Sequence, residues 1–241
     1  MNHRRAERPG VDEEELVDND VLRQAPLFSA LDDEAATALR ASMADTRLRR
    51  GDVLFHEGDE GDKLYVVIEG KVKLGRTSSD GRENLLAILG PGQMFGELSL
   101  FDPGPRSATV TAVTDTTFSS LSHEDLLRWL DGRPGVARGL LTQLAGRLRK
   151  ANDVVADLVF SDVPGRVAKA LLDLADRFGR SADDGVHVHH DLTQEELAQL
   201  VGASRETVNK ALADFVSRGW MRLEPRSVVI MDIERLSRRA R

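Results

Sequence analysis

Apolar residues follow different spacings along the chain, and each spacing predicts a different kind of element. Residues 21–42 carry apolar positions at helical intervals, with a break near residues 31–34. From residue 48 to about residue 121, short aliphatic and β-branched runs alternate with Gly–Asp and Pro–Gly turns. Many short strands with regular turn signals are typical of a β-sandwich or a jelly-roll barrel. We therefore expect a helical segment followed by a β-barrel.

A long helix is predicted after the barrel. One helix should follow Ser122 and end before Pro134, and a longer one should cover about residues 136–160. Its apolar residues recur at alternating steps of three and four, at Leu141, Leu144, Leu148, Ala151, Val155 and Leu158. Such a seam suits either a helix packed on its own domain or a parallel two-helix dimer. Because the helix joins two predicted domains, the pattern favours the dimer.

The pattern beyond residue 161 predicts a second domain. Pro164 and Gly165 are expected to interrupt the helix and to form a hinge at residues 161–165. An amphipathic helix over residues 167–178 and a short strand at residues 186–189 should follow.

Residues 191–215 have the pattern of a helix, a tight turn and a second helix. Thr193 and Glu196 have the spacing of a capping box, which marks the start of the first helix. Gly202 supplies a left-handed turn residue, and Ser204 suits the cap of the second helix. The core of this unit should include Leu197, Leu200, Val208, Leu212 and Phe215. Residues 219–230 predict a β-hairpin wing, with Trp220 in the core.

The outer face of the second helix predicts DNA binding. In a helix-turn-helix, side chains near the start of the second helix meet base edges in the major groove. Arg205 can bind guanine through two hydrogen bonds, and Glu206 can accept one from cytosine. The expected contact residues are Thr193, Ser204, Arg205, Glu206, Thr207, Asn209 and Lys210. The alternative is a helical hairpin with a charged solvent face, but the caps, the turn and the basic C-terminal end together favour DNA.

A second candidate site lies inside the predicted barrel, at residues 95–101 and 105–108. Gly96 lets a ligand approach the backbone, and a short helical turn at residues 98–101 would present free N–H groups to an anion. Arg106 can hold a phosphate through two parallel hydrogen bonds, and Ser107 adds a hydroxyl donor. Glu97 would repel a phosphate, so it suits sugar hydroxyls. A solvated loop is the alternative for this stretch taken alone.

Composition narrows the class of protein. The 241 residues carry a net charge of −7, yet residues 204–241 hold 9 basic and 5 acidic residues, against 20 and 28 in residues 1–162. The basic footprint therefore lies at the end that carries the helix-turn-helix. The chain has no cysteine, no apolar run of membrane length and no signal-peptide core at its start, so we expect a cytoplasmic protein.

Catalysis and metal binding are not indicated. The sequence shows no nucleophile–base set and no phosphate-binding loop of the Walker type, so an enzyme is not expected. Three neighbouring histidines, His187, His189 and His190, have spacing that suits a strand better than a metal site, so structural roles are expected.

Both motifs, in this order and joined by a seam helix, resemble the Crp/Fnr family of transcriptional regulators, and within it the GlxR-type cyclic-AMP receptor proteins of actinobacteria. The resemblance covers about residues 21–241. The matching words are GRENLL at 81–86, FGELS at 95–99, DPGPR at 102–106, DVPGRVA at 162–168 and GASRETVNK at 202–210. The family implies an α+β chain with four parts: a disordered tail at 1–20, a jelly-roll cyclic-nucleotide-binding domain at 21–135, a dimerisation helix and hinge at 136–161, and a winged helix-turn-helix domain at 162–241.

The resemblance also implies a ligand and its contacts. Cyclic AMP (cAMP) would place its ribose at Gly96 and Glu97, its cyclic phosphate at Arg106 and Ser107, and its adenine against the seam helix. The implied nucleotide-binding residues are Gly96, Glu97, Leu98, Ser99, Arg106, Ser107 and Asn152. A Thr–Ser pair that touches the base in well-known members corresponds here to Ala151 and Asn152. Asn152 can still bond a purine edge, whereas Ala151 cannot, which leaves base selectivity and the strength of nucleotide control open.

The hypothesis at this stage is a homodimeric, cyclic-AMP-responsive regulator of TGTGA-N6-TCACA-like sites, working with RNA polymerase. One alternative keeps this architecture with another effector, or with little dependence on any. A different class, a nucleotide-binding module that regulates an enzyme or a channel, is disfavoured by the helix-turn-helix. The oxygen-sensing branch of the family is set aside because the chain has no cysteine to hold an iron–sulfur cluster.

Overall fold

The computed structural model describes residues 20–28, 31–101, 104–131 and 133–241. The predicted tail at 1–20 therefore lies outside the described residues except for Asp20. Residues 20–24 are helical, and α2 (Asp33–Ala41) restarts the helix after the predicted break. The Asp32 side chain caps α2 by accepting a hydrogen bond from the Ala35 N–H at 2.8 Å.

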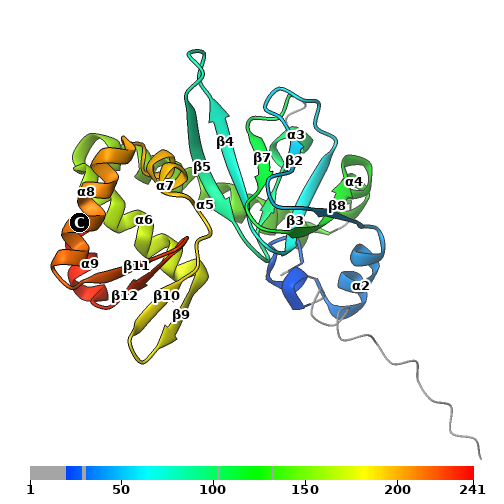
Figure 1. Ribbon diagram of the computed structural model, residues 1–241. Coiled ribbons are helices and arrows are strands. Elements are labelled where there is room, and N and C mark those ends of the chain that lie inside the picture. The colour runs from blue at the N-terminus through cyan, green and yellow to red at the C-terminus, as the bar shows by residue number, and fades with distance from the viewer. Residues whose placement is uncertain (1–19, 29–30, 102–103, 132) are drawn as a thin grey trace, which may run out of the picture.

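Two four-stranded antiparallel sheets form the barrel, as the sequence predicted (Figure 1). One sheet contains β1 (Ala44–Leu48), β8 (Thr116–Ser122), β3 (Lys63–Glu69) and β6 (Met94–Phe95), in that order. The other contains β2 (Val53–Phe55), β7 (Thr109–Ala112), β4 (Val72–Thr77) and β5 (Glu83–Leu89). Buried Val67, Val72, Val110 and Phe118 pack between the sheets, beside stacked rings of Tyr65 and Phe95 whose centroids are 5.3 Å apart.

Three helical segments cover the first sheet. α2, α4 (His123–Leu130) and the start of α5 (Pro134–Phe160) bury a second apolar cluster that includes Leu39, Leu64, Leu126, Val136 and Leu140. Pro134 does not only end the preceding helix. It begins α5 as one of its first residues, where proline costs no hydrogen bond.

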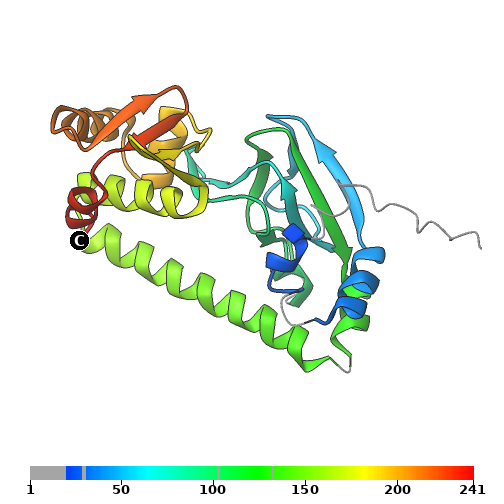
Figure 2. The same cartoon turned by 90° about the horizontal axis from the view of Figure 1, so that it is seen from below.

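Helix α5 leads from the barrel to the C-terminal domain (Figure 2). The hinge lies a few residues earlier than predicted. The helices are interrupted at Ser161 and Asp162, and not at Pro164 and Gly165. Helix α6 (Val163–Phe178) already contains the latter two residues in its first turn, and the Asp162 carboxylate caps it through the Gly165 N–H at 2.9 Å. A proline in the first turn is tolerated there, so it starts this helix instead of interrupting one.

The C-terminal domain packs four helices with a four-stranded sheet. The sheet order is β11 (Met221–Glu224), β12 (Ser227–Ile230), β10 (Gly185–Val188) and β9 (Gly179–Ala182). Helices α6, α7 (Gln194–Val201), α8 (Arg205–Ser217) and the final α9 (Ile233–Arg239) enclose a core with Leu171, Leu197, Leu212 and Phe215. The predicted 219–230 hairpin is present, and Trp220 stacks half-buried on Phe215 with centroids 5.5 Å apart. Strand β9 was not predicted, because Gly179–Ala182 has no apolar alternation.

Two of the three histidines have structural surroundings. His187 Nε2 lies 2.6 Å from Asp184 Oδ1, and this contact, with Arg222, lowers the pKa of Asp184 to about 2. His190 is buried, and its Nδ1 accepts the Leu192 N–H at 3.1 Å. Within the described ranges, no three His, Asp or Glu side chains are placed to share a metal ion.

His190 gives a pH prediction. Burial lowers its pKa from 6.5 to about 4, so below pH 6.5 the unfolded chain binds a proton that the folded chain does not. The free energy of unfolding should therefore fall by up to about 3 kcal/mol as the pH drops from 6.5 to about 4. Urea unfolding of the wild type and of His190→Gln at several pH values measures this effect. Equal pH slopes for the two proteins would contradict the assignment to His190.

Candidate functional site

The barrel holds a buried guanidinium. Arg106 is 4% exposed, lies 4.3 Å from the ring centroid of Phe55, and donates from Nη1 to the Gly96 carbonyl at 3.0 Å. Burial lowers its pKa, which means that the charge is poorly solvated. Among the described residues, no carboxylate comes within ion-pair distance of it. A buried cation in this situation is poised to take an anion as its partner.

Two glycines make room for that guanidinium. Gly96 has φ +82°, and a Cβ there would lie 2.8 Å from Arg106 Nη1 and 2.9 Å from the Lys63 carbonyl. Gly61 was not predicted, yet a Cβ at this position would lie 2.8 Å from Arg106 Nε and 2.6 Å from Ser99 Oγ. Both positions therefore require glycine for the arginine to keep its place.

Glu97 joins the barrel to α5. Its side chain is 1% exposed, and its Oε1 is paired with Arg147 of α5. Its other oxygen, Oε2, is buried without a hydrogen-bond partner. Arg147 also donates to the Met94 carbonyl, so it fixes the helix against β6 as well. The free carboxylate oxygen fits the predicted role of Glu97 as an acceptor for hydroxyl groups.

Sequence reasoning missed Arg147. A signal was present, because Arg147 precedes Ala151, one of the two positions matched to the base-contacting pair of the family, by four residues and therefore lies on the same side of the helix. The seam was predicted from apolar positions, and an arginine is not one of them. Arg147 and Gln143, whose Nε2 donates to the Met94 carbonyl at 3.3 Å, belong instead to the side of α5 that faces the barrel.

The other residues predicted to bind the nucleotide differ in their burial and in their distance from the Arg106 centre. α3 (Leu98–Phe101) forms the predicted helical turn directly after Glu97. Ser99 is buried, whereas Leu98 and Ser107 are exposed. Asn152 is exposed on α5, and no contact within the described chain joins it to the Arg106 centre. The single chain thus brings together Gly96, Glu97, Ser99 and Arg106, but not Asn152.

A cavity of about 510 Å³ lies at the start of β3, next to the Arg106 centre, with Gly61 in its lining. Its described lining includes Glu60, Asp62, Ser99 and His123. Two carboxylates face it, which disfavours a phosphate, and of the predicted nucleotide residues that the structure describes only Ser99 reaches it. The lining therefore disfavours this cavity as a phosphate site.

The seam of α5 is uncovered. Leu141, Leu148, Val155 and Leu158 are 66%, 64%, 61% and 54% exposed, Ala151 is exposed, and Leu144 is half-buried. Helix α5 has buried its barrel-facing side through Val136 and Leu140, so the seam is a second apolar stripe on the same helix. A stripe of this size on one helix is typical of an interaction face.

The helix-turn-helix has the predicted caps and turn. The capping box of Thr193 and Glu196 is complete, Gly202 is left-handed at φ 69°, and Ser204 accepts the Thr207 N–H at 3.2 Å. Thr193, Ser204, Arg205, Glu206, Thr207 and Lys210 are all exposed. Figure 1 shows α8 on the side of the C-terminal domain away from the barrel.

One residue of the recognition surface differs from expectation, and two others form an ion pair. Asn209 was expected to be exposed, but it is half-buried and its Oδ1 lies in the interior without a partner. The cause is helical periodicity, because Asn209 lies three residues before buried Leu212 and therefore toward the inner side of α8. Lys210 and Glu206 form an ion pair at 2.7 Å across one turn, so each would have to exchange this partner for a DNA group.

None of the helices in the described part of the chain is both long and apolar enough to cross a membrane.

A family model described as a cyclic nucleotide-binding domain matches residues 45–133, and one described as a Crp-like helix-turn-helix domain matches residues 165–239. The chain is 54% identical over 223 residues to the CRP-like cAMP-activated global transcriptional regulator of Mycobacterium tuberculosis, covering 92% of this chain and 100% of that protein. It is 38% identical over 211 residues to the cyclic AMP receptor protein of Thermus thermophilus, covering 88% and 94%.

The structural comparison agrees. The c-di-GMP responsive global regulator CLP of Xanthomonas campestris matches with a TM-score of 0.72 at 27% identity, covering 83% of this chain and 99% of that one. The M. tuberculosis protein is named as a transcriptional regulator and the X. campestris protein as a global regulator, in line with the expectation that this chain is not an enzyme. With such identity over nearly its whole length, the chain belongs to the Crp family of transcriptional regulators, with a cyclic nucleotide-binding domain followed by a Crp-like helix-turn-helix domain.

Proposed function

We propose that this protein is a homodimeric transcription regulator whose DNA binding responds to cyclic AMP. The observation that carries the proposal is the buried Arg106 guanidinium, which has no carboxylate partner among the described residues and lies near the Glu97 carboxylate with its unused oxygen. This pair matches a ligand that combines a phosphate with sugar hydroxyls. The relatives from M. tuberculosis and T. thermophilus, which are named for cyclic AMP, support that choice of nucleotide.

In this proposal the cyclic phosphate takes Arg106 and the nearby Ser107 hydroxyl. The ribose lies at Gly96 and at Glu97 Oε2, with Leu98 and Ser99 completing this side of the pocket. The adenine lies against α5, where Asn152 offers hydrogen bonds to the base edge. Arg147 holds Glu97 in place from the same helix, so nucleotide occupancy and the position of α5 are coupled through one carboxylate.

The dimer would form by pairing the α5 seams of two copies. The exposed row from Leu141 to Leu158 has the a/d spacing of a parallel coiled coil. Two recognition helices would then enter successive major grooves, about 34 Å apart, on a pseudo-palindrome such as TGTGA-N6-TCACA. Cyclic AMP shifts the protein toward the DNA-competent state only by the difference in its affinity for the two states. RNA polymerase is the proposed partner on DNA, and the cytoplasm, at the nucleoid, is the proposed location.

The test is fluorescence anisotropy on a labelled TGTGA-N6-TCACA duplex, at one fixed salt concentration, with and without cyclic AMP. Salt must be fixed because phosphate contacts make DNA affinity steeply salt-dependent. A clear gain in affinity on adding nucleotide supports the proposal and shows that Ala151 is tolerated in the pocket. Failure to bind this duplex, with and without nucleotide, would contradict the proposed operator.

Arg205 gives a prediction about sequence reading. Arg205→Ala should cost about 1–3 kcal/mol on the specific duplex, because a bidentate contact to guanine is lost. The loss on a scrambled duplex of equal length should be much smaller. Lys169→Ala, which removes a cation paired with Asp157 on α5, is the control for a change in net charge. An equal loss on both duplexes would mean that Arg205 contacts only phosphate.

Ala151 favours a second candidate, in which the same architecture responds to another cyclic nucleotide or only weakly to any. The side chain has no polar atom with which to read a base. The X. campestris relative is named for c-di-GMP, so the fold accommodates different effectors. Parallel calorimetric titrations with cyclic AMP, cyclic GMP and cyclic di-GMP separate the candidates, since the effector is the nucleotide that binds and also raises DNA affinity.

A further inference from the structure

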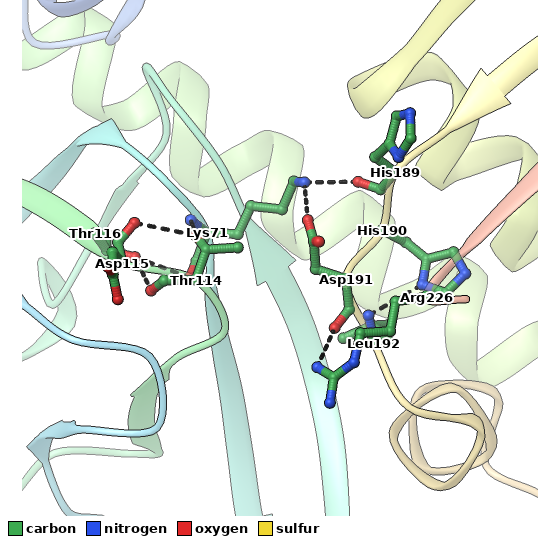
Figure 3. Close-up of polar contacts among 9 residues, drawn as sticks. All are labelled: Lys71, Thr114, Asp115, Thr116, His189, His190, Asp191, Leu192 and Arg226. Atoms are coloured by element: carbon green, nitrogen blue, oxygen red, sulfur yellow. Dashed lines mark hydrogen bonds and ion pairs between the residues drawn. The ribbon is translucent and has the colours of Figure 1, made fainter. Parts of the chain in front are cut away.

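The two domains of one chain meet outside the nucleotide site, through a short segment of the barrel. Lys71 and Lys73 flank Val72 at the start of β4, so strand alternation turns both lysines away from the barrel core while Val72 is fully buried. Lys71 Nζ is paired with Asp191 and donates to the His189 carbonyl at 2.6 Å (Figure 3). Lys73 Nζ lies 2.6 Å from Glu196 Oε1.

Both ends of this contact are held rigidly. The Lys71 N–H donates to Thr114 Oγ1 at 2.8 Å, and its carbonyl accepts from Thr116 Oγ1 at 3.1 Å, so the β7–β8 connection fixes its backbone. Asp191 adopts φ 62°, a left-handed conformation that is uncommon for a residue with a side chain. Its N–H donates to the Arg226 carbonyl at 2.9 Å, which keeps the carboxylate pointing at Lys71.

Apolar packing surrounds the ion pairs. Leu85, Ile88 and Val113 of the barrel form a buried cluster with Leu192 of the DNA-binding domain. Phe178 and Leu200 pack against this cluster, and both also pack against the core of the DNA-binding domain, where Leu200 was expected. Lys71 Nζ also lies 4.9 Å from the Phe178 ring centroid. The ion pairs are therefore partly desolvated, a setting in which they are worth more than pairs in open solvent.

The contact between the two domains does not cover α8, the helix predicted to read the DNA bases. It uses the start of α7 and the residues before it, while Arg205, Thr207 and Lys210 of α8 remain exposed. In a helix-turn-helix the first helix crosses the DNA backbone, so carboxylates at its start repel phosphates. Glu196 is already engaged by the Thr193 N–H in the capping box, and Lys73 neutralises its other oxygen.

We propose that Lys71 and Lys73 of the nucleotide-binding domain, with Asp191 and Glu196, form a latch that holds the helix-turn-helix in its DNA-competent orientation and neutralises the acidic start of α7. The proposal rests on the proposed DNA-binding function. In this proposal Lys71 and Lys73 touch neither the nucleotide nor the DNA. They act as positioning residues for operator binding. The latch favours DNA binding, so breaking it weakens binding even when the nucleotide site is full.

The test uses the full-length protein at saturating cyclic AMP and fixed salt. Lys71→Met keeps an unbranched apolar side chain of similar length but removes the ammonium, and with it the contacts to Asp191, the His189 carbonyl and the Phe178 ring. Asp191→Asn keeps a residue type that tolerates the left-handed backbone. Each variant should bind the operator duplex roughly five- to tenfold more weakly. The double variant should be no weaker than either single one, because both remove the same interaction. Arg82→Met, which removes one charge from the distal end of the β4–β5 hairpin, should bind like the wild type.

A second readout does not depend on DNA. Hydrogen exchange of the 189–200 segment in the DNA-free protein should be several-fold faster in Lys71→Met than in the wild type, and unchanged in Arg82→Met. If the wild type fails to bind the duplex while this exchange still rises, the proposed function fails and the contact stands. The latch itself is overturned by unchanged DNA affinity, by tighter binding, by additive losses in the double variant, or by unchanged exchange in Lys71→Met.

Discussion

Arg106→Ala should weaken cyclic-AMP binding by two to three orders of magnitude. The reason is that the variant removes the buried positive charge proposed to meet the cyclic phosphate, and a charge left without its partner in a buried site costs about 3–5 kcal/mol. Isothermal titration calorimetry of the full-length protein measures the change. The wild-type guanidinium already has Phe55 on one side and the Gly96 carbonyl as one acceptor, so little rearrangement is needed for the anion to bind.

Arg106→Lys is the matched variant, because it keeps the charge but loses the two parallel donors. It should bind cyclic AMP with intermediate affinity. Thermal unfolding and circular dichroism of both variants separate loss of the ligand contact from loss of the fold. Wild-type affinity in a folded Arg106→Ala protein would exclude Arg106 as the phosphate ligand and return attention to the 510 Å³ cavity at the start of β3.

Leu148→Glu should dissociate the dimer and abolish tight binding to the palindromic operator. Leu148 is 64% exposed in the single chain, so the substitution should leave the monomer folded. In the dimer each copy would lose a buried leucine, for about 3–6 kcal/mol in all, and two carboxylates would face each other across the seam. Sedimentation velocity gives the oligomeric state, and anisotropy gives the accompanying loss of DNA affinity that follows from losing two-site attachment.

Thr142→Glu is the control for this substitution. Thr142 is exposed on the same helix but lies outside the a/d positions, so the added charge should leave the dimer intact. A Leu148→Glu protein that sediments and binds the operator as the wild type does would remove the seam from the interface. The apolar stripe of α5 would then need a different partner.

The sequence predicted most of the elements because their signals are local. The Thr193 and Glu196 capping box, the left-handed Gly202 and the Ser204 cap depend on residues only a few positions apart, and the structure shows all three. The alternation of short strands and turns likewise predicted the barrel. The ends of helices were predicted less accurately where one residue type can either start or end a helix. Pro164 was expected to interrupt a helix, yet it lies in the first turn of α6, because proline suits a helix start as well as it ends one.

The candidate site was predicted only in part. Gly96, Glu97, Ser99 and Arg106 are near each other in sequence, and the structure does bring them together. Arg147 and Gly61 were missed because they come from distant segments, one on α5 and one before β3. The half-buried position of Asn209 was missed because a polar residue gives no local sign of facing inward.

The sequence by itself determined the family, the order of the cyclic nucleotide-binding domain and the helix-turn-helix domain, and the helix caps. Those features depend on residue type and short spacing, which a linear chain displays directly. Only the tertiary structure decided that Arg147 reaches Glu97, that Gly61 makes room for Arg106, and that Lys71 and Lys73 meet Asp191 and Glu196. Each of these contacts joins residues far apart in the chain, and their pairing depends on how the sheets and helices pack rather than on any pattern along the sequence.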